Sequence, residues 1–325
     1  ALASGVAALQ LTADLPAGSY GVTAQFTSAS QFYVGGASGA AALNVSRENV
    51  AAAYAGDAAL LTAGPNVNTA TVRLAARLTP EQDGAAFVGD ITKAAVRFEL
   101  FKMNNTTATP DLVVANVAVD ANGDASASAQ GVPAETYTVR VRVEAANQFW
   151  VASPAGLGVL DVAVPTDELR SGGGGWVADA GSAGGRASFG FNVSAGKKDG
   201  QVRGNWTLVF RGADGFDHVV KSTAWQDGYL QFAAETGVSP AAYTRSELKG
   251  RCNVQKIDPA TGQTVASFGN YTFEAHTFDG DLLTPKQADA YAFVVRDGAG
   301  QVWHQAGSRA SLSTLGGGNI NNKGR

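Results

Sequence analysis

Asp120, Asn122 and Asp124 place three oxygen-bearing side chains at alternate positions, the spacing that calcium-binding loops use. Such loops end with a bidentate glutamate at the twelfth position, where this chain has Gly131. A hairpin turn with Asn122-Gly123 at its tip explains the same residues without a cation. The sequence therefore leaves a weak calcium site and a plain turn as alternatives.

No other group of residues has the spacing of a metal or catalytic site. His218, His276 and His304 are far apart in the sequence, and none stands at ligand spacing from another histidine or from a cysteine. Cys252 is the single cysteine, so an intramolecular disulfide is excluded and we expect a buried, inert thiol. The chain lacks a nucleophile elbow, a phosphate loop and a dinucleotide fingerprint. We expect no catalytic residues, no metal and no cofactor.

Two features suggest contact with sugars. Trp225, followed by Gln226 and Asp227 in a predicted loop, could form a platform on which a glycan stacks, although core filling explains most tryptophans. The chain also has six Asn-x-Ser/Thr sequons, an excess that is typical of secreted proteins but also arises where Asn and Thr are common in turns. The candidate glycosylation sites are Asn44, Asn104, Asn105, Asn192, Asn205 and Asn270.

The composition of the 325 residues favours short strands and excludes some partners. The net charge of -4 offers no broad basic surface for phosphates, so nucleic acid is not an expected partner. No apolar run is long enough to span a membrane. Forty glycines and only 16% charged residues suit tight turns and strands better than helices.

A cassette that occurs twice organises the chain. Leu15 to Val34 and Val132 to Val151 share Pro, Tyr, Val, Gln and Phe at the same positions, and the second copy follows at an offset of 117 residues. The match runs on to Val45 and Val162. A period of this length indicates tandem domains.

Alternation within the cassette predicts an antiparallel β-structure. Tyr137, Val139, Val141 and Val143 fall on one face of a strand, with threonines, arginines and Glu144 on the other, which predicts a half-buried strand. Residues 48–165 contain about seven such short strands separated by turn signals. We therefore expect an all-β fold, with an immunoglobulin-like β-sandwich over residues 48–165.

Residues 1–165 resemble the Ig-like repeats of large bacterial surface and secreted proteins. The resemblance rests on three motifs: Tyr54-Ala55-Gly56-Asp57, Gly89 to Phe98, and Gly131 to Val139 with its Glu-Thr-Tyr-Thr-Val sequence. It implies tandem sandwiches and identifies a module, not a ligand.

Residues 172–320 resemble the all-β post-COAP-1 module that follows such repeats in bacterial extracellular proteins. The matching residues include Gly175-Trp176-Val177, Gly204-Asn205-Trp206, Gly269 to Phe273, Asp289 to Phe293 and Leu315 to Ile320. The resemblance implies an accessory domain without an established activity. The preceding Ser171 to Gly175 run has the composition of a flexible linker.

Three domains follow: residues 1–47 as the C-terminal part of an Ig-like domain, residues 48–165 as a complete sandwich, and residues 166–325 as a C-terminal all-β domain. By the 117-residue offset, residues 1–47 lack the front of a repeat, equivalent to residues 48–117. Tyr20, Val22 and Phe26 would then present an open apolar face. Either the chain derives from a longer precursor, or another chain supplies the missing strands, and we favour this assembly joint.

The favoured function is an extracellular or cell-surface structural protein, part of a fibre, filament, wall layer or adhesin stalk. Its partners would be copies of itself or other surface-protein chains. The alternative is a carbohydrate-binding or adhesion module. An enzyme ranks third, because neither a nucleophile nor a metal constellation is visible.

Overall fold

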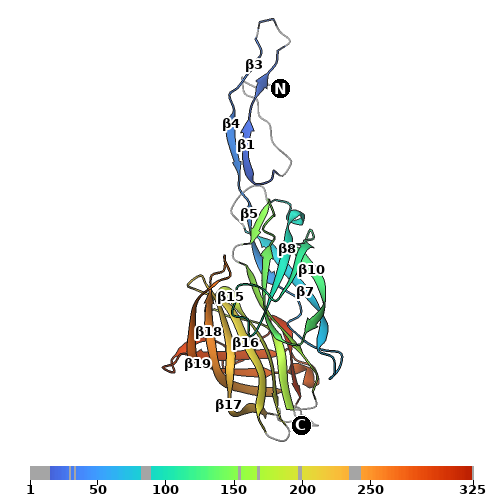
Figure 1. Cartoon of the computed structure of the whole chain (residues 1–325), viewed down its shortest axis with the longest axis vertical. Helices are drawn as coiled ribbons and strands as arrows, with labels where there is room; N and C mark the ends of the chain where they lie inside the picture. Colours follow the sequence, from blue (N-terminus) through green and yellow to red (C-terminus); the bar gives the residue numbers. More distant parts are fainter. Residues whose placement is uncertain are drawn as a thin grey trace.

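The computed structural model describes residues 15–28, 31–32, 34–81, 89–152, 155–166, 169–196, 200–233 and 243–323. These residues form an all-β structure, as the sequence predicts, with two short 3-10 turns at Ile91–Lys93 and Gly280–Leu282 as the helical elements. Within the described part of the chain, no helix is both long and apolar enough to cross a membrane. Three parts follow one another: a thin ribbon, a two-sheet sandwich and a large curved sheet (Figure 1).

The ribbon consists of four short strands near the N-terminus. β1 (Gly18–Val22) pairs antiparallel with β4 (Ala41–Val45), and β2 (Gln25–Phe26) pairs with β3 (Gly36–Ala37). In Figure 1 the ribbon extends along the long axis of the molecule, away from both other parts. The described strands of the ribbon therefore do not form a closed domain.

The sandwich has two sheets that enclose one core. One sheet has the order β10-β7-β5-β12, and the other has the order β6-β13-β11-β8-β9. The largest side chains sealed between them include Trp150, Tyr137, Phe98 and Leu74, each at most 1% exposed. The strands are β5 (Glu48–Tyr54), β6 (Ala59–Leu61), β7 (Thr69–Pro80), β8 (Ala95–Lys102), β9 (Leu112–Ala118), β10 (Asp124–Pro133), β11 (Thr136–Val143), β12 (Trp150–Ala152) and β13 (Gly156–Ala163).

β11 corrects one expectation, because it is buried on both faces. Tyr137, Val139 and Val141 point into the sandwich core, as their alternation predicts. The opposite face is not exposed, however, and Arg140 retains only 3% of its accessible surface. The C-terminal sheet packs on this face, and the Arg142 guanidinium donates to the Ala260 carbonyl at 2.8 Å. The alternation identified the core face correctly but could not reveal a second layer from residues far along the chain.

The third part is one curved sheet of ten strands, in the order β21-β20-β19-β18-β17-β16-β15-β14-β23, with β22 beside β20. Its concave side buries a second core that includes Trp206, Phe189 and Tyr291. The strands are β14 (Leu169–Ala178), β15 (Ser182–Ala195), β16 (Val202–Gly212), β17 (Asp217–Ala233), β18 (Arg245–Ile257), β19 (Thr264–Phe278), β20 (Ala290–Arg296), β21 (Val302–Ala306), β22 (Ser313–Thr314) and β23 (Gly317–Lys323).

The glycine run expected to be a linker is instead the middle of β14. This strand pairs with β15 on one side and with β23 on the other, and its glycines are buried. A Cβ on Gly174 would lie 2.3 Å from the Ala58 carbonyl oxygen, and one on its neighbour Gly190 would lie 2.4 Å from Val159. Glycine is needed here because the sandwich approaches the curved sheet too closely for any side chain.

An apolar cluster completes this junction. Val159 of the sandwich packs with Val209, Val219 and Ile257 of the curved sheet. The described part of residues 48–323 thus combines two β units through a buried contact, and among the described residues the ribbon lies outside this contact.

Candidate functional site

The ribbon repeats the strand pairing of one part of the sandwich. In β1 and β4, Tyr20 stands opposite Leu43, and in β11 and β13, Tyr137 stands opposite Leu160. Both residues are shifted by the same 117 positions. The repeat seen in the sequence is therefore also a repeat of strand register.

The two tyrosines also make the same hydrogen bond. The Tyr20 hydroxyl donates to the Pro16 carbonyl at 2.7 Å, and the Tyr137 hydroxyl donates to the Pro133 carbonyl at 3.0 Å. This arrangement is a tyrosine corner, in which a tyrosine at the start of a strand bonds back to the main chain. The ribbon therefore has the local structure of a sandwich edge without the rest of the sandwich.

The difference between the copies is what covers them. In the sandwich, Val139 is 0% exposed, whereas its ribbon equivalent Val22 is 48% exposed. Phe26 is 39% exposed, and Val143 at the equivalent position is 9% exposed. Tyr20 is half-buried. Two of the three residues predicted to form an assembly interface, Val22 and Phe26, are thus exposed, and Tyr20 is partly covered.

Among the described residues, one edge of β1 also has no strand partner. In β11, main-chain groups alternate between the two neighbouring strands: the Glu135 carbonyl accepts from Val162 on the β13 side, and the Glu144 amide donates to Ala95 on the β8 side. Thr138 therefore faces β8, and its ribbon equivalent Gly21 faces the edge of β1 away from β4. In the part of the chain that the structure describes, no strand pairs with that edge.

The base of the ribbon is fixed to the sandwich. The Ala17 amide donates to the Gln148 carbonyl at 2.8 Å, and the Glu48 amide donates to the Phe149 carbonyl at 2.8 Å. The Arg47 guanidinium adds a bond to the Asn147 carbonyl at 3.3 Å. All three acceptors lie in the segment just before β12, so the ribbon starts from a defined anchor.

Trp225 is not in a loop, contrary to expectation. It lies within β17, where its indole N–H donates to the Gly204 carbonyl at 2.9 Å. Its ring meets the edge of Phe273, with 5.6 Å between centroids. The ring is half-buried and held by its neighbours. The sequence could not show this, because β17 continues past the polar residues that suggested a loop.

The structure favours the turn over calcium at Asp120, Asn122 and Asp124. One oxygen of Asp120 accepts from the amides of Asn122 at 2.8 Å and of Asp124 at 2.9 Å. These bonds, that to Asp124 first, lower the pKa of Asp120. Asp124 in turn pairs with Arg77 at 2.7 Å. The carboxylates of Asp120 and Asp124 thus already accept hydrogen bonds from N–H groups. Gly123 has the positive φ of 83° that the turn needs.

The candidate sequons fall into two groups. Asn44, Asn104 and Asn270 have exposed side chains. Asn105, Asn192 and Asn205 are half-buried, and their side-chain amides bond to Asp111, Arg170 and Glu135, respectively. Attachment of a glycan to the second group would break these contacts, and Asn44 also accepts a hydrogen bond from the Ser19 hydroxyl at 2.6 Å, so Asn104 and Asn270 are the better acceptors.

Cys252 is buried and free, as expected, and burial raises the pKa of its thiol to about 12. The three histidines each face a carboxylate: Asp214 at 3.1 Å from His218, Glu274 at 2.8 Å from His276, and Asp179 at 2.8 Å from His304. Only the His304 pairing joins residues far apart in the sequence: Glu274 and His276 both lie on β19, and Asp214 lies four residues before His218.

One of these groups has the composition of a cation site. Ligand atoms of Glu247, Glu274 and His276 lie within 4.8 Å of one another. The Lys249 ammonium already stands between the carboxylates, 2.5 Å from Glu247 and 3.4 Å from Glu274. Because this cation neutralises the acidic pair, the group is better explained as an ion-pair network.

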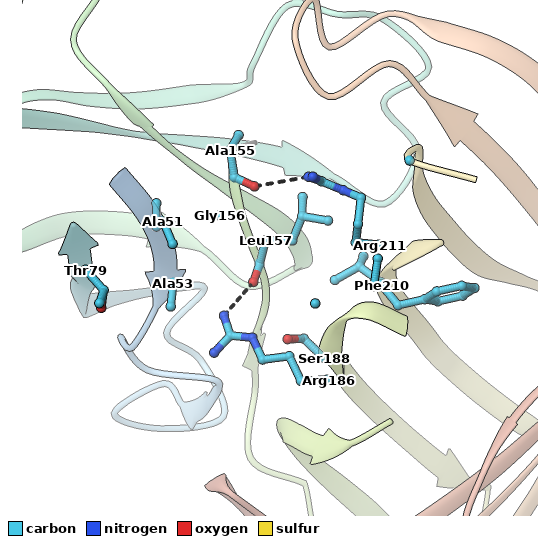
Figure 2. Close-up of a pocket in the computed structure, with 15 residues that line it drawn as sticks. Ala51, Ala53, Thr79, Ala155, Gly156, Leu157, Arg186, Ser188, Phe210 and Arg211 are labelled. Atoms are coloured by element: carbon cyan, nitrogen blue, oxygen red, sulfur yellow. Dashed lines mark hydrogen bonds between the residues drawn. The ribbon is translucent and has the colours of Figure 1, made fainter. Parts of the chain in front are cut away.

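A cleft of about 580 Å³ lies between the sandwich and the curved sheet (Figure 2). Two guanidinium groups in its wall reach the same edge of β13: Arg211 donates to the Ala155 carbonyl at 3.2 Å and Arg186 to the Leu157 carbonyl at 3.3 Å. β13 pairs with β6 only from Asp161 onward. The two arginines therefore occupy a strand edge that would otherwise be open, and the cleft is part of the junction.

No protein-family model matches the chain, and no curated protein matches it either. The resemblances to Ig-like repeats and to the post-COAP-1 module therefore stay predictions. The ribbon remains the candidate functional site, because its apolar residues Val22 and Phe26 are exposed and one edge of β1 pairs with no described strand.

Proposed function

We propose that this chain is a structural segment of an extracellular or cell-surface assembly. Residues 48–323 supply a rigid body, and the ribbon of residues 15–47 is the joint that binds neighbouring chains of the same assembly through β-strand contacts. The single observation that carries this proposal is the ribbon's identity in register with β11 and β13, combined with the exposure of its apolar face.

An unpaired strand edge beside an open apolar face is suited to bind another strand. Exposed edges offer main-chain donors and acceptors to another chain, and apolar side chains next to them gain free energy when they are covered. Val22 and Phe26 are large enough to contribute about 1–2 kcal/mol each when they are buried. The exposed sequons at Asn104 and Asn270 agree with an extracellular location.

The alternative of a carbohydrate-binding module gains no comparable support. Trp225, its proposed platform, is half-buried and held by Gly204 and Phe273. We therefore retain the structural function as the proposal.

Association of the purified chain tests the proposal. Light scattering and electron micrographs would compare the wild-type chain with Val22→Lys, which places a charge on the apolar face. Asn44→Lys is the matched control, because it adds the same charge to an exposed position of the same ribbon. We expect concentration-dependent association in the wild type and the control, and loss of association in Val22→Lys. A wild-type monomer at all concentrations whose first 46 residues resist protease would overturn the proposal.

A further inference from the structure

We propose that a polar pocket around Lys221 binds a short hydroxyaldehyde, and that the Lys221 amine captures this compound as an imine. The pocket has a volume of about 520 Å³, which lies within the range of small-molecule sites. It lies outside the ribbon, and this binding function goes beyond the proposed structural role and requires no partner chain.

Strand pairing gathers polar side chains on one face of the curved sheet. Lys221 of β17 stands opposite Thr207 of β16 and Asn253 of β18. Because side chains alternate along a strand, Asn205 and Gln255 project from the same face as Lys221. The adjacent positions along these strands belong to the second core, so the polar face is the outer one. Apart from Thr207, all of these residues line the pocket.

The sandwich supplies the opposite wall of the pocket. Asn104 and Thr106 line it from the segment after β8, and Glu135 lines it from the turn between β10 and β11. The Glu135 carboxylate accepts from the Thr136 amide at 3.0 Å and from the Asn205 side-chain amide at 3.2 Å. The two β units therefore form the site jointly, and a hydrogen bond between them holds its carboxylate in place.

The Lys221 side chain brings an amine to this pocket. Its Nζ donates to the Asn105 carbonyl at 3.2 Å, and the residues on both sides of that acceptor line the pocket. Within the described part of the chain, Lys221 forms no ion pair. Burial lowers the pKa of the amine to about 8, although the carboxylates of Asp111 and Glu135 act in the opposite direction. A partly desolvated lysine of this kind has more of the neutral form that attacks carbonyl compounds.

Imine formation needs no reactant besides the aldehyde. The neutral amine adds to the carbonyl carbon, a proton moves from nitrogen to the carbonyl oxygen, and the resulting carbinolamine loses water to give the imine. Glu135, which lines the same pocket, is a group that can relay this proton.

The lining of the pocket indicates which aldehyde fits. Asn253 and Gln255 carry side-chain amides that make no hydrogen bond to the described chain, and Ser267 adds a hydroxyl. Amide and hydroxyl groups both donate and accept, so they can bind the hydroxyl groups of a ligand. The pocket therefore suits a hydroxyaldehyde better than an apolar aldehyde.

Reductive trapping on the full chain tests this inference. Glycolaldehyde is added at pH 7 with cyanoborohydride, which reduces the imine to a stable amine, and peptide mass spectrometry locates the adduct. We expect Lys221 to be modified at least about tenfold faster than Lys286, which is exposed and pairs with Asp281 at 3.0 Å. The rate at Lys221 should saturate with glycolaldehyde concentration, as binding in a pocket requires.

Two comparisons separate recognition from simple reactivity. The preference for Lys221 over Lys286 should be smaller with propanal, which lacks a hydroxyl group. Gln255→Leu should lower the preference for glycolaldehyde about three- to tenfold through loss of one hydrogen bond. Gln305→Leu is the matched control and should leave it unchanged, because Gln305 is exposed on β21 and does not line the pocket. Far-ultraviolet circular dichroism checks that both variants keep the β-structure.

The wild-type chain alone can contradict the inference. A rate at Lys221 that does not exceed the rate at Lys286, or that stays proportional to glycolaldehyde concentration, would mean that the pocket binds no aldehyde. An equal preference for propanal and glycolaldehyde would overturn the assignment of a hydroxyaldehyde.

Discussion

Tyr20 in the ribbon and Tyr137 in the sandwich occupy equivalent positions of a repeated strand pair, which is enclosed in a core in the sandwich and partly exposed in the ribbon. Each hydroxyl donates to the carbonyl of the proline four residues earlier, Pro16 in one copy and Pro133 in the other. Tyr137 is 1% exposed and Tyr20 is half-buried. The pair therefore forms an internal comparison: equal local structure with unequal packing.

We therefore expect truncation of the two tyrosines to lower the free energy of unfolding by different amounts. Tyr137→Ala removes a large ring from the sealed core and should lower the free energy of unfolding by about 3–5 kcal/mol. Tyr20→Ala removes a ring that is only partly covered, so its cost should remain below about 1 kcal/mol. Urea unfolding followed by fluorescence measures both. Similar losses for the two variants would mean that the ribbon is packed as tightly as the sandwich.

The glycines of β14 give a second prediction. A Cβ at Gly174 meets the main chain of Ala58, so Gly174→Ala forces two packed units apart and should cost more than about 2 kcal/mol. The matched control is Gly172→Ala in the same strand, where the nearest atoms belong to the end of the Arg170 side chain. Thermal unfolding of both variants gives the readout. If Gly174→Ala is as stable as Gly172→Ala, the close approach is wrong.

These two cases show what the sequence could and could not predict. The spacing of Tyr137, Val139 and Val141 predicted a strand and its core face correctly, because both depend on local alternation. The burial of Arg140 and Gly174 depends on elements far apart in the chain: the curved sheet covers Arg140, and Ala58 approaches Gly174. A run of glycines has the composition of a linker, and only the neighbouring unit shows that it is a packing surface.

The candidate site shows the same division. The offset between the copies identified Tyr20, Val22 and Phe26 as an open apolar set, and of these Val22 and Phe26 are exposed whereas Tyr20 is half-buried. The direction in which the Gly21 amide points could not be predicted from the sequence, because it depends on the register of β1 with β4. The prediction for Trp225 was wrong because the polar residues Gln226 and Asp227 suggested a loop, whereas β17 continues through them.

Asp161 predicts a pH dependence of stability. Burial raises the pKa of its carboxyl to about 6, against the effects of a hydrogen bond from Thr136 and of the charge of Arg170. The folded state therefore binds more protons than the unfolded state between about pH 4 and 6, and this contribution to stability falls as pH rises through that window.

Asp161→Asn keeps an acceptor for Thr136 but does not titrate. We expect the variant to gain stability relative to the wild type as pH rises from 4 to 7, by on the order of 2 kcal/mol at the upper end. Urea midpoints at several pH values measure this difference. A difference that stays constant with pH would show that Asp161 is charged in the folded protein throughout the window.

Cys252 predicts slow thiol chemistry. The residue is 1% exposed, and burial raises the pKa of its thiol to about 12, so little thiolate forms near neutral pH. Alkylation by iodoacetamide should be more than about 100-fold slower in the folded chain than in denaturant. Mass spectrometry follows the reaction at this single cysteine. Rapid labelling of the folded chain would contradict the burial of Cys252.

The most direct test of the assembly joint is hydrogen exchange at two equivalent amides, Gly21 in the ribbon and Thr138 in the sandwich. Thr138 faces β8 and should exchange slowly, whereas Gly21 faces an edge with which no described strand pairs and should exchange rapidly in dilute solution. On association, Gly21 should become protected while Thr138 stays unchanged. If Gly21 is already as protected as Thr138 in the dilute monomer, its edge is covered within its own chain and the ribbon is not a joint.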